Sequence, residues 1–283
     1  LIQTEQGDFT ASYILNSAFL QAGVLAGETK TSSAKTFSPD TQIKNRAKPT
    51  AGQISNNFLQ HFKGWTIDTA PGTFDPEAMT FMDFRIEQCG ETRFVYVLPL
   101  SDSRALVEFT VFSPALLPVP EYELALENYL TAFLSIKNYS IVDEEFGVIP
   151  MTDFQFPSRQ DGRLIHIGTA GGFVKASSGY AFKRTQQKIR AFVDAWERTG
   201  APDPQVFRSS RLFQGFDSIF LQVLKNNNAL GGEIFTRLFR QLPPDLVLRF
   251  LDEETTFAEN LRLISVPPTL PFLRAFFQVS FGK

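Results

Sequence analysis

Cysteine and histidine are scarce in this 283-residue chain. Cys89 is the single cysteine, and His61 and His166 are the two histidines. These three residues cannot form an intramolecular disulfide or a closed zinc site. The sequence therefore predicts no metal centre and gives no sign of an oxidising compartment, and we expect a reduced, cytoplasmic location.

Long apolar runs and blocks of basic residues are also missing. No stretch of 18 apolar residues occurs, so no helix is expected to span a bilayer. The formal net charge of −3 and the absence of a basic block argue against nucleic acid as a partner. The chain starts at Leu1 without a methionine or a signal segment, and we expect that an amino-terminal region precedes it.

Several catalytic signatures are absent as well. The sequence contains no Gly-Lys-Ser/Thr phosphate loop, no Gly-x-Ser-x-Gly and no histidine–carboxylate zinc spacing. ATPases, α/β-hydrolases and zinc enzymes therefore have little support. Phenylalanine, in contrast, is abundant, with 30 Phe against 2 Trp and 6 Tyr. This bias indicates either a Phe-packed core or a pocket for a long apolar ligand.

The most informative stretch is residues 94–110. Two runs of alternating apolar residues flank a Ser-Asp-Ser-Arg turn at 101–104, which predicts a β-hairpin. In the second strand, Glu108 shares a face with Leu106, Thr110 and Phe112. A lone carboxyl among apolar side chains holds its proton with a raised pKa. Glu108 is thus a candidate proton donor to an apolar substrate, although a solvated strand residue is the commoner meaning of such a position.

Strand patterns dominate from residue 57 to residue 150, and they predict an antiparallel sheet with one crossing helix near residues 126–134. Alternation over residues 79–86 puts Phe81, Asp83 and Arg85 on one face. The two charged residues, Asp83 and Arg85, are either functional groups or a structural ion pair. We expect His61 to be a satisfied core histidine. Upstream, residues 1–18 suggest a hairpin that turns at 6–8, and residues 19–53 a long surface connection.

A glycine-rich turn follows a short apolar strand at 163–167. Gly168, Gly171 and Gly172 lie in this turn, and a helix with an apolar stripe at 189–196 comes after it. Strand, glycine turn and helix can bring backbone N–H groups close to a phosphate or a ring. The alternative is a turn without a ligand.

After Gly200 the chain is predicted to be helical. Apolar stripes occur at 216–224, 234–242 and 246–251, followed by a Phe-rich end. Five arginines are interleaved with Leu and Phe, which suits an element at a membrane surface or, alternatively, helices packed on the core with solvated arginines. These arginines are Arg237, Arg240, Arg249, Arg262 and Arg274.

Six motifs occur in a characteristic order. They are Gln60-His61-Phe62-x-Gly64-Trp65, Phe81-Met82-Asp83-Phe84-Arg85, Phe94-x-Tyr96-x-Leu98-Pro99-Leu100, Leu106-Val107-Glu108-x-Thr110, Gly147-Val148-Ile149-Pro150-Met151 and Gly168-x-x-Gly171-Gly172 with Ser178-Gly179-Tyr180. In this order the sequence resembles the flavin-dependent lycopene cyclases of carotenoid synthesis, of the bacterial type. The resemblance covers residues 56–190 and, more loosely, the helical end.

The resemblance implies a fold and a reaction. The fold is mixed α/β (α+β), with an incomplete FAD/NAD(P)-binding Rossmann-like domain, an antiparallel substrate-binding sheet and a helical C-terminal region. The reaction closes the linear ends of lycopene into β-ionone rings, as in β-carotene formation, without net redox change. It uses reduced FAD, with NAD(P)H as the reductant. The family's Gly-x-Gly-x-x-Gly loop does not occur in these residues, which implies an amino-terminally truncated chain.

The resemblance also suggests roles for residues. Glu108 lies where the family has its acid/base glutamate, and Asp83 and Arg85 are further catalytic candidates. The cofactor-binding candidates are Gly168, Gly171, Gly172, Ser178, Gly179 and Tyr180. The expected domains are a remainder of the FAD-binding domain with its connection (1–55), a substrate-binding domain (56–156), a return segment of the FAD-binding domain (157–199) and a helical, membrane-associating region (200–283).

The expected partners are lycopene or a related linear carotenoid and, because such a substrate dissolves only in lipid, a membrane surface. Two other functions stay open at this point. One is an FAD-dependent oxidoreductase, a hydroxylase or prenyl reductase, acting on an isoprenoid or aromatic substrate. The other is a non-catalytic carotenoid- or lipid-binding protein.

Overall fold

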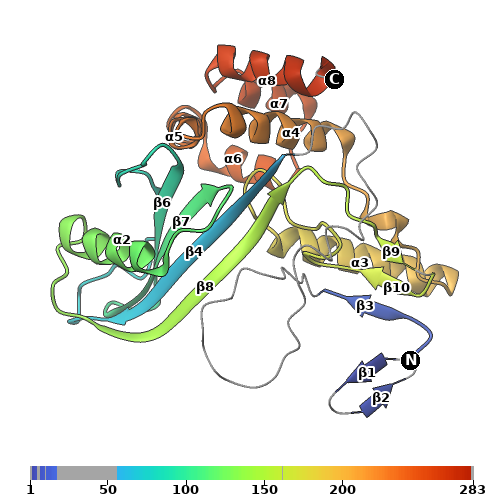
Figure 1. The fold of residues 1–283 in the computed structure, drawn as a ribbon, viewed down its shortest axis with the longest axis horizontal. Coiled ribbons are helices and arrows are strands. Elements are labelled where there is room, and N and C mark those ends of the chain that lie inside the picture. Colours follow the sequence, from blue (N-terminus) through green and yellow to red (C-terminus); the bar gives the residue numbers. More distant parts are fainter. Residues whose placement is uncertain (1, 5–6, 10, 18–55, 161, 282–283) are drawn as a thin grey trace.

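The computed structural model describes residues 2–4, 7–9, 11–17, 56–160 and 162–281. Its largest element is a five-stranded antiparallel sheet of order β5-β6-β7-β4-β8 (Figure 1). The strands are β4 (Asn57–Asp68), β5 (Thr80–Asp83), β6 (Thr92–Pro99), β7 (Arg104–Ser113) and β8 (Ser140–Thr152). The predicted hairpin is therefore confirmed as β6 and β7, and the predicted antiparallel sheet is confirmed.

One face of this sheet packs on helix α2 (Val119–Ala132). Two prolines at its start fix the first turn, where no intrahelical N–H partner is needed. Side chains from alternating positions of β6 and β7 meet the buried stripe of α2, which includes Tyr122, Leu126, Tyr129 and Leu130. Each large side chain buried in this way contributes roughly 1.5–3 kcal/mol. α2 is the crossing helix that the sequence predicted.

The opposite face meets the C-terminal helices at one end of the sheet (Figure 1). These are α4 (Arg211–Asn226), α5 (Leu230–Gln241), α6 (Pro244–Leu251), α7 (Phe257–Ile264) and α8 (Thr269–Phe281). Phe112 of the hairpin packs here against Phe235 of α5, and Phe94 packs edge-on against Phe112 in the same cluster. Much of the abundant phenylalanine is therefore core, as one of the two interpretations proposed.

A second, smaller sheet has the order β3-β10-β9, with β3 (Ile14–Asn16), β9 (Arg159–Gln160) and β10 (Leu164–His166). β3 and β10 are parallel, and α3 (Phe182–Thr199) packs on β10 through Phe192 and Ile165. A short 3₁₀ helix, η1 (Pro204–Phe207), adds Phe207 to this cluster. A parallel pair covered by a helix fits the incomplete Rossmann-like layer that was expected.

The strands predicted at residues 1–4 and near residues 12–15 are observed as β1 (Ile2–Thr4) and β3, but their predicted pairing as a hairpin is wrong. β1 pairs with β2 (Gly7–Phe9), where the turn was expected, and β3 pairs with β10 about 150 residues away. A parallel partner so distant leaves no signal in the local pattern. The connection predicted at 19–53 lies outside the described residues. The division into four domains stays a prediction.

Candidate active site

Glu108 lies at the middle of β7, in the centre of the sheet. Its cross-strand neighbours are Tyr96 on β6 and Gly64 on β4, and Gly64 in turn faces Glu145 on β8. Because directly paired residues project from the same face of a sheet, these four residues form one row. The row lies on the face opposite α2, since Val107 and Phe109 fill the α2 side.

The carboxyl of Glu145 occupies the space above Gly64. A Cβ atom at Gly64 would lie 2.8 Å from both Cγ and Oε1 of Glu145 and 2.9 Å from Leu106. Such separations are too short for a side chain at residue 64. Glycine at this position therefore lets the Glu145 carboxyl lie across β4 towards Glu108, so that Glu108 is not the lone carboxyl that the sequence pattern suggested.

Glu108 is half-buried, and its surroundings favour the protonated form. Burial raises the pKa of Glu108 to about 7, the hydroxyl of Thr110 opposes this shift, and the carboxyl of Glu145 adds to it through a hydrogen bond and its charge. Thr110 donates its hydroxyl hydrogen to Oε1 of Glu108 at 2.9 Å. The raised pKa predicted for Glu108 is thus reproduced, with burial as its largest cause.

Two tyrosines stand beside this carboxyl. The hydroxyls of Tyr96 and Tyr180 lie 3.2 Å apart, and burial raises the pKa of both phenols, to about 12 for Tyr180. Tyr96 also packs edge-on against Phe81 and Phe94. The candidate acid is therefore next to neutral, electron-rich rings.

Tyr180 is carried by a tight loop that crosses the end of β4. Gly179 has a φ of +74°, and a Cβ there would lie 2.0 Å from Oε1 of Gln60 on β4. The backbone of Lys175 holds the loop at both ends, because its N–H donates to Tyr180 O and its carbonyl accepts from Gly179 N. The structure thus brings Ser178, Gly179 and Tyr180 to the Glu108 face.

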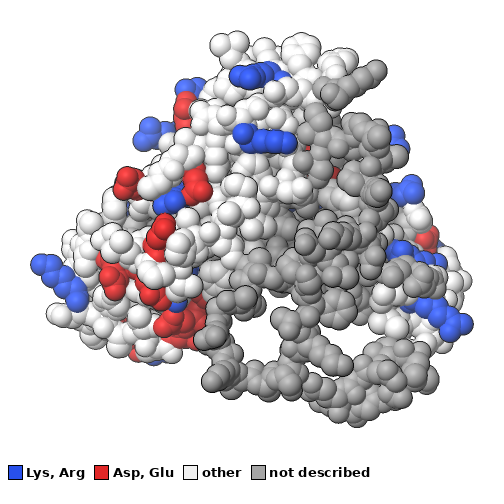
Figure 2. Space-filling model, viewed as in Figure 1, with Lys and Arg blue, Asp and Glu red and all other residues white. Residues whose placement is uncertain are grey.

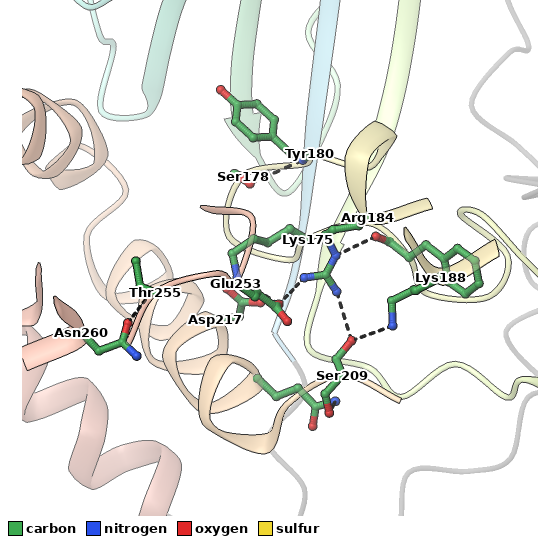
Figure 3. Close-up of polar contacts among 12 residues, drawn as sticks. Lys175, Ser178, Tyr180, Arg184, Lys188, Ser209, Asp217, Glu253, Thr255 and Asn260 are labelled. Atoms are coloured by element: carbon green, nitrogen blue, oxygen red, sulfur yellow. Dashed lines mark hydrogen bonds and ion pairs between the residues drawn. The ribbon is translucent and has the colours of Figure 1, made fainter. Parts of the chain in front are cut away.

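A buried ion cluster anchors the same loop to the C-terminal helices (Figure 3). The Lys175 side chain is fully buried, with Nζ 2.8 Å from Oδ1 of Asp217 and 3.4 Å from Oε1 of Glu253. Arg184 of α3 also pairs with Glu253 and donates to the carbonyl of Phe173 and to Ser209. Sequence reasoning missed this cluster. The one signal was an isolated lysine in the apolar segment 173–176.

The glycine turn at residues 168–172 follows β10 directly. The N–H groups of Gly171, Gly172 and Phe173 all donate to carbonyls within the turn. Close packing also requires two of its glycines, because a Cβ would lie 2.5 Å from His166 O at Gly171 and 2.8 Å from the Phe156 ring at Gly172. These three N–H groups are therefore already used within the turn, and a cofactor contact of the turn stays a prediction.

Beside this turn lies a polar hollow of about 500 Å³. Gly171 and Gly172 line it, together with Arg184, Arg208 and Arg211. Two carboxyls, Asp217 and Glu253, lie on its wall as members of the buried ion cluster. Guanidinium groups bind phosphate and other planar anions well, so the hollow can accept a polar, anionic ligand.

A second cavity of about 360 Å³ is almost wholly apolar and lies among α4–α8. Phe220, Phe235 and Leu238 line it, and Phe220 and Phe235 also belong to the core on the Glu108 face of the sheet. Its walls suit a hydrocarbon without polar groups. This cavity corresponds to the second interpretation of the phenylalanine bias, a pocket for an apolar ligand.

Asp83 and Arg85 are not brought together with Glu108. Arg85 forks onto both oxygens of Asp83, Tyr129 of α2 donates to Asp83 at 2.8 Å, and the guanidinium lies over Phe133. This arrangement belongs to the α2 side of the sheet. The prediction that Phe81 shares their face is wrong, because the register of β5 shifts after Thr80 and Met82 has a φ of +52°.

His61 is fully buried on that same α2 side. Its Nε2 lies 2.8 Å from Ser113 Oγ and its Nδ1 2.6 Å from the Tyr122 hydroxyl. Burial lowers the pKa of His61 to about 4, so the ring is neutral at physiological pH. The prediction of a satisfied core histidine is confirmed. The described residues contain no cluster of His, Cys, Asp and Glu that could hold a metal ion.

The family model described as lycopene cyclase protein matches residues 29–276. The chain belongs to the lycopene cyclase family. A lycopene beta-cyclase from Pantoea ananas is 27% identical in an alignment of 251 positions, which covers 79% of this chain and 61% of that protein. The chain thus spans about three fifths of that relative's length.

Two solved structures illustrate how far the likeness extends in three dimensions. A geranylgeranyl bacteriochlorophyll reductase-like protein from Thermoplasma acidophilum shares 13% identity, with a TM-score of 0.41 over 80% of this chain and 53% of that one. A flavin-dependent halogenase from Brevundimonas sp. BAL3 shares 14% identity, with a TM-score of 0.33 over 78% and 42% of the two chains.

Proposed function

We propose that this chain is the acid-bearing part of a lycopene beta-cyclase, which closes the linear ends of lycopene into β-ionone rings. One observation supports this above others. Glu108, the carboxyl at the centre of the sheet, has a pKa raised to about 7 by burial and stands beside aromatic rings. An acid that is half protonated near neutral pH can deliver a proton to a hydrocarbon.

The proposed reaction begins with transfer of the Glu108 proton to the terminal double bond, which creates a tertiary carbocation. The next double bond attacks this cation and closes the ring, and loss of a ring proton to a carboxylate completes the sequence. The substrate gains one proton and loses one, so no net redox change occurs. The rings of Tyr96 and Tyr180 would stabilise the cation electrostatically, and an apolar setting would exclude the water that quenches it.

The remainder of the hydrocarbon needs an apolar site of its own. We propose the cavity among α4–α8 for this role, since Phe220 and Phe235 connect it with the core beneath the Glu108 face. A bulky residue such as Trp in place of Leu238 would fill it. That variant is expected to raise KM for lycopene and to leave the pH dependence of turnover unchanged.

The family implies FAD, and the described residues fit its polar, anionic part in the hollow beside the glycine turn. Arg208 and Arg211 would hold it there through their guanidinium groups, while Arg184 on the same wall is already paired with Glu253. When bound and reduced by NAD(P)H, FAD would supply an electron-rich ring close to the developing positive charge. Ser178, Gly179 and Tyr180 would position the loop between this hollow and Glu108.

The proposed flavin site can be tested by substitution of its exposed arginine. Arg211→Gln in the purified full-length protein is expected to lower flavin absorbance per polypeptide by about tenfold, since a charge-assisted hydrogen bond contributes roughly 1.5–3 kcal/mol. Arg198→Gln, on the far end of α3, is the control. Equal flavin content in the two variants would contradict this site.

The cyclase itself is tested in lycopene-accumulating cells that express the full-length gene. Glu108→Gln is expected to abolish ring formation, whereas Glu87→Gln, an exposed carboxyl near β5, retains it. Unchanged cyclisation in the Glu108 variant would instead indicate a carotenoid-binding protein. Stoichiometric consumption of NADPH by the purified enzyme would indicate a hydroxylase or reductase, because cyclisation consumes none.

We also propose that α7 and α8 contact a membrane surface. Their exposed side chains include Phe257, Leu261, Leu270, Phe277 and Phe281, with Arg262 and Arg274 among them. Figure 2 shows mostly uncharged atoms with a few Lys and Arg at the upper end, where α8 lies in Figure 1. Apolar side chains flanked by arginines suit insertion at the lipid head-group level. No helix of the described residues is long and apolar enough to cross a bilayer.

Flotation with anionic lipid vesicles tests the membrane contact. The double variant Leu270→Ser, Phe277→Ser is expected to reduce vesicle binding, because burial of the two apolar side chains in lipid would contribute roughly 3–6 kcal/mol to the binding free energy. Leu124→Ser, an equally apolar and exposed position on α2, serves as the control. Equal binding by both variants would contradict a contact through α7 and α8.

A further inference from the structure

Two carboxyl side chains converge over one glycine in the centre of the sheet. Gly64 of β4 pairs with Glu108 of β7 on one side and with Glu145 of β8 on the other. Oε1 and Cγ of Glu145 would each lie only 2.8 Å from a Cβ at Gly64. The Glu145 carboxyl thus lies over the residue that pairs directly with Glu108, and its charge favours the protonated form of Glu108. Two carboxyls that meet across one residue can hydrogen-bond to each other only if one of them carries a proton.

The direction of Glu145 is specific to this residue among its neighbours. Glu144 pairs with Trp65 across the strands and therefore projects to the other face, where its carboxylate lies 2.9 Å from Lys63 Nζ. Lys63 also pairs with Glu123 of α2. Glu144 is thus balanced by a cation, whereas the groups that act on Glu108 include no cation among the described residues.

The groups that face Glu108 come from each element around it. Tyr96 of β6 and Tyr180 of the 173–180 loop supply neutral phenols, Thr110 of β7 donates a hydrogen bond, and Glu145 of β8 supplies the second carboxyl. Two residues along β8 from Glu145, Asp143 lies exposed on the same face, opposite Thr66. Among the described residues, Glu145 is therefore the carboxyl whose charge acts on Glu108.

We propose that Glu145 is a positioning residue that shares one proton with Glu108 across Gly64, and this role rests on the proposed cyclase function. In the first step the O–H bond of Glu108 breaks as a C–H bond forms at the terminal alkene carbon. In the last step a ring C–H bond breaks and an O–H bond forms again on the carboxyl pair. The pair holds one proton before and after each turnover, so no further acid, base or oxidant is required.

The test compares two neighbouring glutamates with the same change of charge. Glu145→Gln in the full-length enzyme removes the like charge beside Glu108, so the alkaline limb of the kcat profile is expected to move down by about one pH unit. Activity would then fall about tenfold at pH 8 and be retained at pH 5.5. Glu144→Gln should keep the parent profile, and Glu145→Asp should restore part of the shift. Identical profiles for the two Gln variants, or loss of activity at every pH in the Glu145 variant, would overturn the proposal.

Gly64→Ala provides a variant that keeps both carboxyls. Its new Cβ displaces the Glu145 carboxyl, so the alkaline limb is expected to move in the same direction as in Glu145→Gln. A readout without substrate separates this proposal from the cyclase assignment. Infrared pH titration follows the protonated Glu108 carboxyl, whose band is identified by its absence in Glu108→Gln. A lower titration midpoint in Glu145→Gln supports the shared proton even if the parent forms no rings. An unchanged midpoint overturns it even if rings form.

Discussion

Nζ of Lys175 lies 2.8 Å from Oδ1 of Asp217, and the lysine side chain is fully buried. Lys175 precedes the loop that carries Tyr180, and Asp217 belongs to α4. The ion pair therefore joins the loop over the Glu108 face to the helical end of the molecule. Glu253, at the end of α6, joins it through both Lys175 and Arg184. The structure thus links the proposed acid site, the polar hollow and the C-terminal helices through one charged cluster.

Removal of one partner of this pair should be strongly destabilising. Lys175→Met leaves the carboxyls of Asp217 and Glu253 buried with one cation fewer, and we expect a loss of about 3–5 kcal/mol in the free energy of unfolding. Lys183→Met is the control, because its side chain is half exposed and its ion pairs contribute at most about 1 kcal/mol. Urea denaturation measures both variants. A similar small loss for the two lysines would show that the buried cluster contributes little to stability.

Gly179 and Gly200 allow backbone strain and steric overlap to be separated. Both have a positive φ, +74° and +72°, but a Cβ at Gly179 would overlap Gln60, whereas nothing lies within 4 Å of Gly200. We expect Gly200→Ala to lower the free energy of unfolding by about 1 kcal/mol from the left-handed backbone alone. Gly179→Ala should lower the free energy of unfolding by about 1–3 kcal/mol more than Gly200→Ala, because steric overlap with Gln60 is added to the backbone strain.

A double variant tests this interpretation of Gly179. Gln60→Ala in the Gly179→Ala background removes the overlapping amide, so part of the additional loss should be recovered, whereas Gln60→Ala combined with Gly200→Ala should be additive. Urea unfolding of the set gives the coupling energy. Additive losses at residues 60 and 179 would mean that the two side chains do not meet as the structure describes.

Local patterns were sufficient for elements whose partners are close in the sequence. The 94–110 hairpin, the α2 stripe and the apolar stripes of α4 to α6 all have their periodicity within a few residues, and each was predicted as an element, although α2 begins at Val119, ahead of the predicted residues 126–134. The parallel pairing of β3 with β10 was not predicted, because its partners are about 150 residues apart. Phe81 was misplaced for a different reason, since a register shift in β5 breaks the period of two.

The same distinction holds for the site. Glu108 could be chosen from the sequence because a carboxyl among the apolar residues of a strand coincides with the motif order of the family, whereas the strand pattern alone fits a solvated residue equally well. Glu145 could not, since it follows two other acidic residues on a strand edge that looks solvated, and only the pairing of β8 with β4 brings it over Gly64. Lys175 and Asp217 are 42 residues apart and have no shared motif. Their contact depends on how α4 packs.

Glu108 should make the protein less stable at alkaline pH. A carboxyl whose pKa rises from 4.5 unfolded to about 7 folded binds more protons in the folded state, so its contribution is present below pH 4.5 and is lost as the pH rises through 7. The loss amounts to up to about 3 kcal/mol. Glu108→Gln should therefore be more stable than the parent at pH 8 and nearly equal to it at pH 4.5. Urea unfolding at the two pH values measures this, with Glu87→Gln as the exposed control. A constant difference between parent and Glu108→Gln would contradict the raised pKa.

His61 should make the protein less stable at acidic pH, which is the opposite pH dependence to that of Glu108. Burial lowers its pKa from 6.5 to about 4, so the unfolded chain binds more protons between these values and stability falls as the pH drops through this window. The loss reaches up to about 3 kcal/mol near pH 4. His61→Gln retains a polar side chain that can bond Ser113 or Tyr122 but cannot take up the proton. It should be less stable than the parent at pH 7.5, because it cannot reproduce both hydrogen bonds, and this deficit should shrink by pH 4.5. A deficit that stays constant over that range would mean that the pKa of His61 is not lowered in the folded protein. His166→Gln is the control, because it replaces a half-buried histidine that lies outside the large sheet.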